Sequence, residues 1–162
     1  MATNVLLKEF KNNFFPSIIL RLYQVYGPYQ DNNRFVPFII NSCIKNKKFP
    51  CSEGTQFRDF LHIDDAVNAV SKCIDNKKAY GKIINIGYGK TSQLRQITLK
   101  IRNYINKGYP NFGEIKMRKD EEISIFPKIN RAQKILKWKP LISFKKGLEK
   151  TINFYKRNNL VY

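Results

Sequence analysis

Apolar and polar positions change their spacing several times along the chain, which indicates helices and strands in alternation. The segment 2–12 has its apolar residues on one helical face and ends before Pro16, so we expect the latter part of a helix there. The next run, 17–23, is mostly apolar, which is typical of a strand buried on both faces of a parallel sheet. Gly27-Pro28 ends this strand in a loop, where ligands of open α/β sheets gather.

The later segments continue the pattern. Apolar residues at helical spacing predict further helices over 35–44, 66–74, 92–105 and 144–155, the last with Ser143 as its cap, and short apolar runs predict strands over 81–89 and 114–117.

Arg58 stands among apolar residues that favour burial. An unpaired buried charge is very costly, so this arginine needs an anion or a carboxylate as its partner. The planar guanidinium fork suits bidentate contact with a phosphate. An internal salt bridge to Asp59 or Asp64 is the alternative.

The acidic and histidine side chains that follow Arg58 have simple structural interpretations. His62 is the single histidine of the sequence, so neither a histidine metal cluster nor a Ser-His-Asp triad is expected. We expect His62 to be packed or hydrogen-bonded. Asp64 and Asp65 precede a helical pattern, and we interpret them as its N-cap in preference to a catalytic pair.

Composition narrows the functional classes. The 162 residues suit one domain or one large piece of a bigger one, and a 43% hydrophobic content provides a core. The formal net charge of +18 makes nucleic-acid binding an alternative, but the lysines are scattered and no zinc-finger spacing occurs. Three widely spaced cysteines fit reduced thiols and give no thiolate metal site. With no leader and no long apolar run, we expect a soluble, cytoplasmic protein without a membrane span.

Three segments resemble the extended short-chain dehydrogenase/reductases of the NAD-dependent epimerase/dehydratase family, which epimerise or dehydrate nucleotide sugars. Residues 54–65 look like that family's glycine turn, Gln-x-Arg-Asp-Phe, aromatic or His, and paired Asp. Residues 20–28 resemble its Leu-Arg-x-x-Asn-x-Tyr-Gly-Pro signature, and 130–140 resembles its short helix followed by Leu-Gly-Trp-x-Pro. The resemblance covers nearly the whole chain but only the C-terminal half of the family.

This resemblance implies an α/β fold, namely the C-terminal part of an NAD(P)-binding Rossmann-like fold, with about two parallel strands and their helices, plus a small substrate-binding α/β subdomain. The chain 1–162 is then a single partial domain, in which 1–28 and 59–90 are the remnant of the Rossmann sheet, and 29–58 and 91–162 form mainly the substrate-binding subdomain.

The resemblance also implies binding residues for a nucleoside diphosphate sugar with a UDP, dTDP, CDP or GDP group. Arg58 resembles the arginine that grips the diphosphate, and Arg118 resembles a second phosphate-binding arginine, although a solvated surface arginine is the alternative. Gln24 stands at the family's substrate-contacting Asn and adds a methylene to it.

Phe35 is a candidate for the nucleobase pocket, with plain core packing as the alternative. The backbone of the edge from Phe49 to Cys51 is expected to contact the base, although Cys51 replaces the aromatic that relatives carry. The backbone at Leu22 is expected to face the nicotinamide.

Two parts of the family pattern are missing from this sequence. It has no Gly-x-x-Gly-x-x-Gly turn for the dinucleotide pyrophosphate, and no Tyr has a Lys four positions later. In the family that Tyr transfers a proton while NAD takes up and returns a hydride. We therefore expect a truncated chain that is inactive alone, with no catalytic residue of its own and without bound NAD or NADP. It would need a partner, a homodimer or a missing N-terminal half. A non-catalytic nucleotide-sugar or partner-binding module and a basic nucleic-acid-binding protein are the alternatives.

Overall fold

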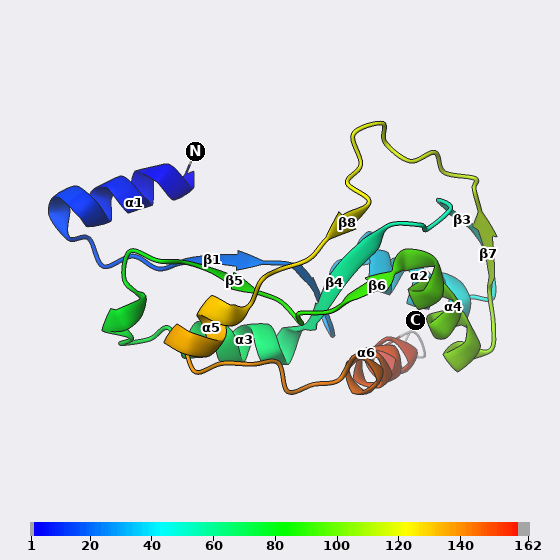
Figure 1. Cartoon of the computed structure of the whole chain (residues 1–162). Helices are drawn as coiled ribbons and strands as arrows, with labels where there is room; N and C mark the ends of the chain where they lie inside the picture. The colour runs from blue at the N-terminus through cyan, green and yellow to red at the C-terminus, as the bar shows by residue number, and fades with distance from the viewer. Residues whose placement is uncertain (1, 159–162) are drawn as a thin grey trace.

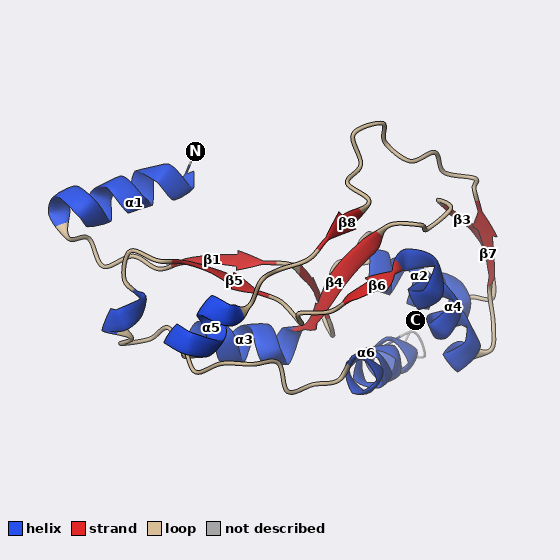
Figure 2. Ribbon diagram, in the orientation of Figure 1, coloured by secondary structure: helices blue, strands red, loops and turns tan. Residues whose placement is uncertain are grey.

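The computed structural model describes residues 2–158 and has the predicted α/β architecture (Figure 1 and Figure 2). Its helices are α1 (Ala2–Asn13), α2 (Phe35–Ile44), α3 (Ile63–Ser71), α4 (Leu94–Ile105), α5 (Asn130–Ile135) and α6 (Phe144–Asn158), with a 3-10 turn at Lys77–Ala79. Its strands are β1 (Ile19–Leu22), β2 (Gln24–Tyr26), β3 (Lys48–Cys51), β4 (Phe57–His62), β5 (Ile83–Ile86), β6 (Thr91–Gln93), β7 (Tyr109–Phe112) and β8 (Ser124–Ile125).

The strands pair mainly in parallel, and the chain changes its pairing partner at Tyr23. Before this residue β1 runs parallel to β5, and after it β2 runs parallel to β4 with Gln24 opposite Phe60. Strand β4 also pairs with the antiparallel β6 and the parallel β8, while β3 and β7 form a separate parallel pair. Two neighbouring strands therefore diverge at Tyr23, which is the arrangement that opens a crevice in α/β sheets.

Two hydrophobic clusters hold these strands. One lies between α2, α4, α6 and the strands β3 and β4, with Ile39, Ile97 and Ile152 fully buried. The other lies on the face of β1 and β5 that α3 and α5 cover in Figure 1, where Ile84 and Trp138 are buried. The small residues of α3 and α5 in this cluster let the helices approach the strands closely.

The first helix lies at one end of the molecule and is lightly attached (Figure 1). None of its described residues is buried. Its Phe10 ring lies against Gly81, where an added Cβ would come within 2.1 Å of the ring. Gly81 has φ +66°, a backbone angle that favours glycine, so both its conformation and its contact exclude a side chain.

Some predicted elements need correction. The first strand is not buried on both faces, because Arg21 and Leu22 are exposed. Residues 114–117 are not a strand but a loop, and the strand lies earlier, at Tyr109–Phe112. The apolar pattern did not predict this strand because β7 contains Pro110 and Asn111. Its extended conformation is stabilised by pairing with β3. Within residues 2–158 no helix is long and apolar enough to cross a bilayer.

Candidate functional site

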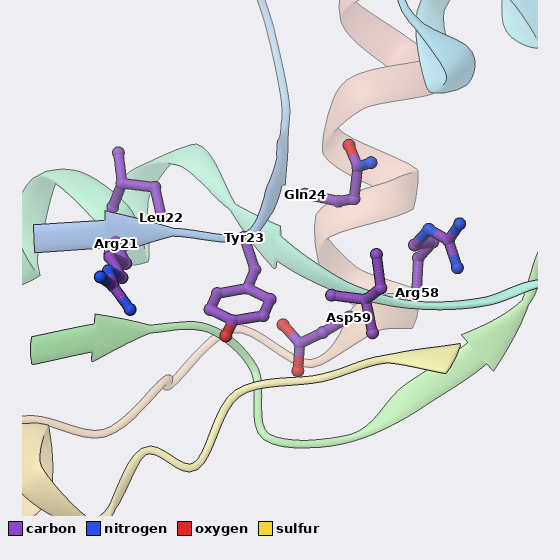
Figure 3. Close-up of a pocket in the computed structure, with 7 residues that line it drawn as sticks. Arg21, Leu22, Tyr23, Gln24, Arg58 and Asp59 are labelled. Atoms are coloured by element: carbon purple, nitrogen blue, oxygen red, sulfur yellow. The ribbon is translucent and has the colours of Figure 1, made fainter. Parts of the chain in front are cut away.

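A cavity of about 410 Å³ opens where the strands diverge (Figure 3). It lies at the carboxyl end of β1 and the start of β2, with β4 and β8 as its other walls. Its lining residues are Arg21, Leu22, Tyr23, Gln24, Arg58, Asp59 and Ile125. Of the residues predicted from sequence, the structure thus brings Leu22, Gln24 and Arg58 together in one cavity, although up to 36 positions separate them.

Arg58 is the buried cation of this cavity, with 6% of its surface exposed. One guanidinium nitrogen donates to the carbonyl oxygens of Phe57 at 2.9 Å and Ile123 at 3.4 Å. The other nitrogen forms an ion pair with the carboxylate of Glu121. The internal salt bridge that sequence reasoning kept as an alternative is therefore present, but with Glu121 in place of Asp59 or Asp64. Glu121 lies 63 residues further along the chain, so local spacing gave no sign of it.

Gln24 and Arg58 lie on the same face of the paired strands. Gln24 is opposite Phe60, and Arg58 precedes Phe60 by two positions, the period at which strand side chains share a face. Figure 3 shows the Gln24 amide and the Arg58 guanidinium extending from neighbouring strands. Leu22 is 51% exposed at the same opening. The cavity therefore combines a cation, an amide and an apolar residue.

Two further cavities share residues with this one. A cavity of about 450 Å³ is lined by Gln24, Phe35 and Phe60 among others. Phe35 also lines a third cavity of about 180 Å³, together with Cys51. Because successive cavities share a lining residue, they lie next to one another between Leu22 and Cys51.

Phe49 and Arg118 lie differently from these residues. The Phe49 ring is 3% exposed and packs edge-on against Phe38 at 5.9 Å, so its side chain belongs to the core. Arg118 is exposed on the loop between β7 and β8 and lines none of the three cavities. This loop also carries Glu121, whose N–H donates to the Arg118 carbonyl oxygen at 3.2 Å. Arg118 is thus close in the chain to the partner of Arg58.

Asp59 is a residue of the cavity that sequence reasoning did not single out. Its carboxylate accepts backbone N–H bonds from Tyr88 at 2.6 Å, Gly89 at 2.6 Å and Lys90 at 3.1 Å. Burial raises the pKa of Asp59, and these three hydrogen bonds oppose the rise. A Cβ added to Gly87 would come within 2.8 Å of a carboxylate oxygen of Asp59. Asp59 therefore fixes the loop after β5. The sequence signal that could have identified Asp59 as a cavity residue was its position directly after Arg58.

The next acidic pair corrects the predicted helix cap. Helix α3 begins at Ile63, and its N-cap is His62, whose Nδ1 accepts the Asp64 N–H at 3.2 Å. Asp65 is buried and accepts the N–H groups of Leu141 and Ile142, which ties the C-terminal segment to α3. A cap must precede the first helical residue, and the helix begins earlier than its apolar spacing indicated.

His62 itself is packed, as expected. It is 2% exposed, and its ring lies edge-on to Tyr26 at 5.5 Å. Burial lowers the pKa of His62, and Lys150 adds to this, while Asp64 and Asp65 oppose it. The imidazole is neutral near pH 7 and serves as a cap and a core side chain.

The chemistry that these residues offer is anion binding. Asp59 is saturated by backbone donors, and Arg58 is a permanent cation. Within residues 2–158 no group of three His, Cys, Asp or Glu side chains has the placement of metal ligands. Leu22, the residue predicted to face a nicotinamide, lines this cavity, but the sequence has no glycine-rich turn that would fit the pyrophosphate of NAD.

Comparison with known sequences identifies the family of the chain. The profile of the NAD dependent epimerase/dehydratase family matches residues 1–87. The chain is 34% identical over 140 residues to a CDP-abequose synthase of Salmonella typhimurium, covering 82% of this chain and 46% of that protein. It is 31% identical over 146 residues to a putative UDP-glucose 4-epimerase of Methanocaldococcus jannaschii, covering 87% and 46%. The chain spans about half the length of the curated relatives it matches.

Solved structures give the same result. Pal from Bacillus thuringiensis superposes with a TM-score of 0.90 at 26% identity, over 97% of this chain and 51% of that one. UDP-glucuronic acid 4-epimerase from Bacillus cereus, solved with UDP-glucuronic acid and NAD, superposes with a TM-score of 0.87 at 28% identity, over 96% and 50%. These likenesses confirm the Rossmann-like fold class. The protein therefore belongs to the NAD-dependent epimerase/dehydratase family.

Proposed function

We propose that this chain is the nucleotide-sugar-binding part of an NAD-dependent epimerase/dehydratase, and that Arg58 binds the diphosphate of a nucleoside diphosphate sugar. The observation that carries this proposal is a buried arginine, with 6% of its surface exposed, lining a cavity that opens at the carboxyl end of β1 between the parallel pairs β1–β5 and β2–β4. Ligands of such sheets bind at that edge. The relative solved with UDP-glucuronic acid supports the ligand class.

The partners of Arg58 describe how a diphosphate is held. One nitrogen is occupied by backbone carbonyl oxygens, which fixes the plane of the fork. The other nitrogen points to the Glu121 carboxylate, and a phosphate oxygen takes the place of that carboxylate when the ligand binds. Gln24 donates its amide to the same phosphate group. When Glu121 is displaced, Arg118 on the same loop becomes the second phosphate ligand.

The other end of the ligand extends toward the two neighbouring cavities. Phe35 and Cys51 then line the nucleobase end, and the backbone of Phe49 supports the strand edge beside it.

The proposed division of the chain is a Rossmann remnant, 1–28 and 59–90, and a mainly substrate-binding part, 29–58 and 91–162. The hydrophobic clusters follow it in part, because Ala132, Leu136 and Trp138 pack with the Rossmann strands while Tyr26 and Phe60 pack in the other cluster.

We infer that this chain does not turn over a nucleotide sugar alone. In the family NAD supplies the hydride acceptor, but this sequence lacks the glycine-rich turn and the Tyr-x-x-x-Lys pair. Within residues 2–158 β1 is paired only with β5, and Leu22 and Phe14 are 51% and 81% exposed nearby. A polypeptide that provides the N-terminal half adds strands at this edge. A homodimer is the alternative partner.

Isothermal titration calorimetry with UDP, CDP, dTDP and GDP tests the binding proposal. Arg58→Ala should raise the Kd by about 30-fold or more, because truncating one partner of a buried charge pair costs about 2–5 kcal/mol. Arg58→Lys keeps the charge but loses the fork, and should also weaken binding. Arg157→Ala, an exposed arginine at the end of α6, is the matched control and should change nothing.

Two outcomes contradict the proposal. If Arg58→Ala binds nucleoside diphosphates as tightly as the unmodified chain, Arg58 does not bind the diphosphate. Tight DNA binding with a steep salt dependence that Arg58→Ala does not alter favours the nucleic-acid alternative. Turnover of a nucleotide sugar with NAD by the chain alone contradicts the inferred lack of activity.

A further inference from the structure

Beside β5 and α5 lies a cavity of about 510 Å³ that has no role in the proposed function. Four cationic side chains line it, and we call them the basic cluster: Arg21, Lys128, Arg131 and Lys134. The other lining residues are Ile83, Asn85 and Asn130, so among residues 2–158 no acidic side chain contributes to its wall. The cavity is therefore strongly positive.

The fold brings the basic cluster together from distant parts of the chain. Arg21 lies on β1 opposite Asn85 of β5, and side chains at paired positions share a face of the sheet. Arg131 and Lys134 are three positions apart on α5, so they are neighbours on one helical face. Ala132 of the same helix is buried in the core and anchors it there. Like charges from a strand and a helix thus surround one cavity.

Arg131 is held in place by the backbone of β5. One guanidinium nitrogen donates to the carbonyl oxygen of Ile83 at 2.9 Å. A guanidinium has five N–H donors in a planar fork, so the other donors of Arg131 remain for a ligand. Strand β5 therefore orients an anion-binding group at the cavity before a ligand arrives.

The basic cluster has no carboxylate partner in the part of the chain that the structure describes. The ion pairs found there have Arg58, His62, Arg95 and Lys150 as their basic partners. Like charges held close together repel each other, and a bound anion removes that cost. The cluster therefore suits an anionic ligand better than a purely structural role.

The side chains of the cavity favour phosphate groups as the anion. Arginine binds phosphate through two parallel N–H bonds, and lysine binds it as a point charge. The amides of Asn85 and Asn130 supply further N–H donors. Two phosphate monoester groups carry about −3 to −4 charges at pH 7, which matches four cations.

The same lining argues against a single strand of nucleic acid. Proteins that bind single strands stack the bases on aromatic side chains. Among the described residues none that lines this cavity is aromatic. The cations also converge on one cavity, whereas a nucleic-acid backbone is followed by cations along an extended groove. A small polyphosphate meets both conditions.

We propose that the basic cluster is a second anion site, which binds a small molecule with at least two phosphate groups. The site goes beyond the proposed function, because its ligand contacts neither Arg58 nor Gln24. Among the described residues Arg21 alone lines both this cavity and the Arg58 cavity.

Titration of the chain with inorganic tripolyphosphate, followed in nitrogen–proton correlation NMR spectra, tests the site. The spectra locate the anion without any substitution, and low ionic strength keeps exposed charges unscreened. The amide signals of Asn85, Asn130 and Arg131 should shift and saturate. Shifts confined to residues of the Arg58 cavity would overturn the proposal.

A pair of double variants tests the role of the cations. Lys128→Gln with Lys134→Gln should raise the Kd read from the Arg131 signal by about tenfold, because two of four charge contacts are lost. Lys145→Gln with Lys146→Gln removes the same net charge from exposed sites on α6 and should leave this Kd unchanged. An equal loss of affinity in both double variants would show attraction by the net charge alone and would contradict a built site.

A parallel titration with a duplex DNA oligonucleotide distinguishes the source of the phosphates. The Arg131 signal should respond to tripolyphosphate at lower concentrations of phosphate than to DNA. If it responds to DNA and not to tripolyphosphate, the basic cluster is a nucleic-acid surface and the proposal is wrong.

Discussion

The guanidinium of Arg58 forms an ion pair with the carboxylate of Glu121, which lies 63 residues further along the chain. Arg58 is held by β4, and Glu121 belongs to the loop that leads into β8. The side chain of Arg58 is 7% exposed and that of Glu121 is 27% exposed. A buried cation at the cavity where the strands diverge is therefore neutralised by a carboxylate on a surface loop.

Glu121→Gln should loosen this pair and favour an anionic ligand. The free energy of unfolding should fall by about 1–3 kcal/mol, because a nearly buried arginine loses its counter-charge. The affinity for UDP should rise by roughly fivefold, about 1 kcal/mol, because the phosphate no longer displaces a charged partner. Urea unfolding and calorimetry measure the two effects.

Glu122→Gln is the matched control, since Glu122 is the exposed neighbour of Glu121. It should leave both stability and affinity within experimental error. Weaker UDP binding by Glu121→Gln would show that the carboxylate contributes to ligand binding instead of competing with it.

Asp59→Ala should destabilise the protein by about 3 kcal/mol. The substitution removes the acceptor of three backbone N–H groups at a position that is 1% exposed, and hydrogen bonds to charged groups contribute about 1.5–3 kcal/mol each. Asp59→Asn keeps one oxygen acceptor and should lose less. Asp120→Ala, in an exposed loop, should stay within about 0.5 kcal/mol of the unmodified chain. If Asp59→Ala and the unmodified chain have the same free energy of unfolding in urea, the loop after β5 does not depend on this carboxylate.

Gly147→Ala should lower stability even though alanine is the better helix former. Gly147 lies within α6, where alanine in place of glycine normally gains about 1 kcal/mol. Here a Cβ would come within 2.4 Å of the Tyr26 hydroxyl oxygen and 2.8 Å of His62 Cδ2. Because both neighbours are buried and overpacking costs about 1–3 kcal/mol, the net change should be a loss. Thermal unfolding compared with Asn153→Ala, an exposed site on the same helix, separates packing from helix propensity.

Stability should fall as the pH drops below about 6.5, the ordinary pKa of His62. Burial lowers the pKa of His62 in the folded state, so below pH 6.5 the unfolded chain takes up a proton that the folded chain does not. The contribution of His62 to the free energy of unfolding is complete above the pKa that His62 has in the unfolded chain. It decreases as the pH falls toward the lower pKa of the folded state, by at most about 1.4 kcal/mol per pH unit.

His62→Asn isolates this effect, because asparagine can still cap α3 but does not titrate in this range. The groups that face His62 are Tyr26 from β2, Asp64 and Asp65 from α3, and Lys150 from α6. Urea unfolding between about pH 5.5 and 7.5 should give a smaller slope for His62→Asn than for the unmodified chain. Identical slopes would assign the acid sensitivity to other groups.

The segments at 17–28 and 54–65 were sufficient to predict that Gln24 and Arg58 lie near each other, and the structure has them on the paired strands β2 and β4. Both residues belong to strands whose order along the chain follows the family pattern, so the resemblance carried their approximate positions. The roles of Arg58, Gln24, Phe35, Phe49, Cys51, Arg118 and Leu22 in binding stay predictions that titration must test.

The sequence by itself determined the order of most helices and strands, because apolar spacing and the glycine and proline breaks act locally, and its resemblance to the family implied the Rossmann-like fold class. It also determined that Arg58 needs an anionic partner, since burial of a charge demands one wherever the chain runs. Only the tertiary structure decided that this partner is Glu121, that His62 caps α3 and that Phe112 lies across from Cys51. The Arg58 and Phe112 contacts join segments about 60 residues apart, and the register of β3 on β7 and of β8 on β4 arises from the packing of the whole chain and not from any local pattern.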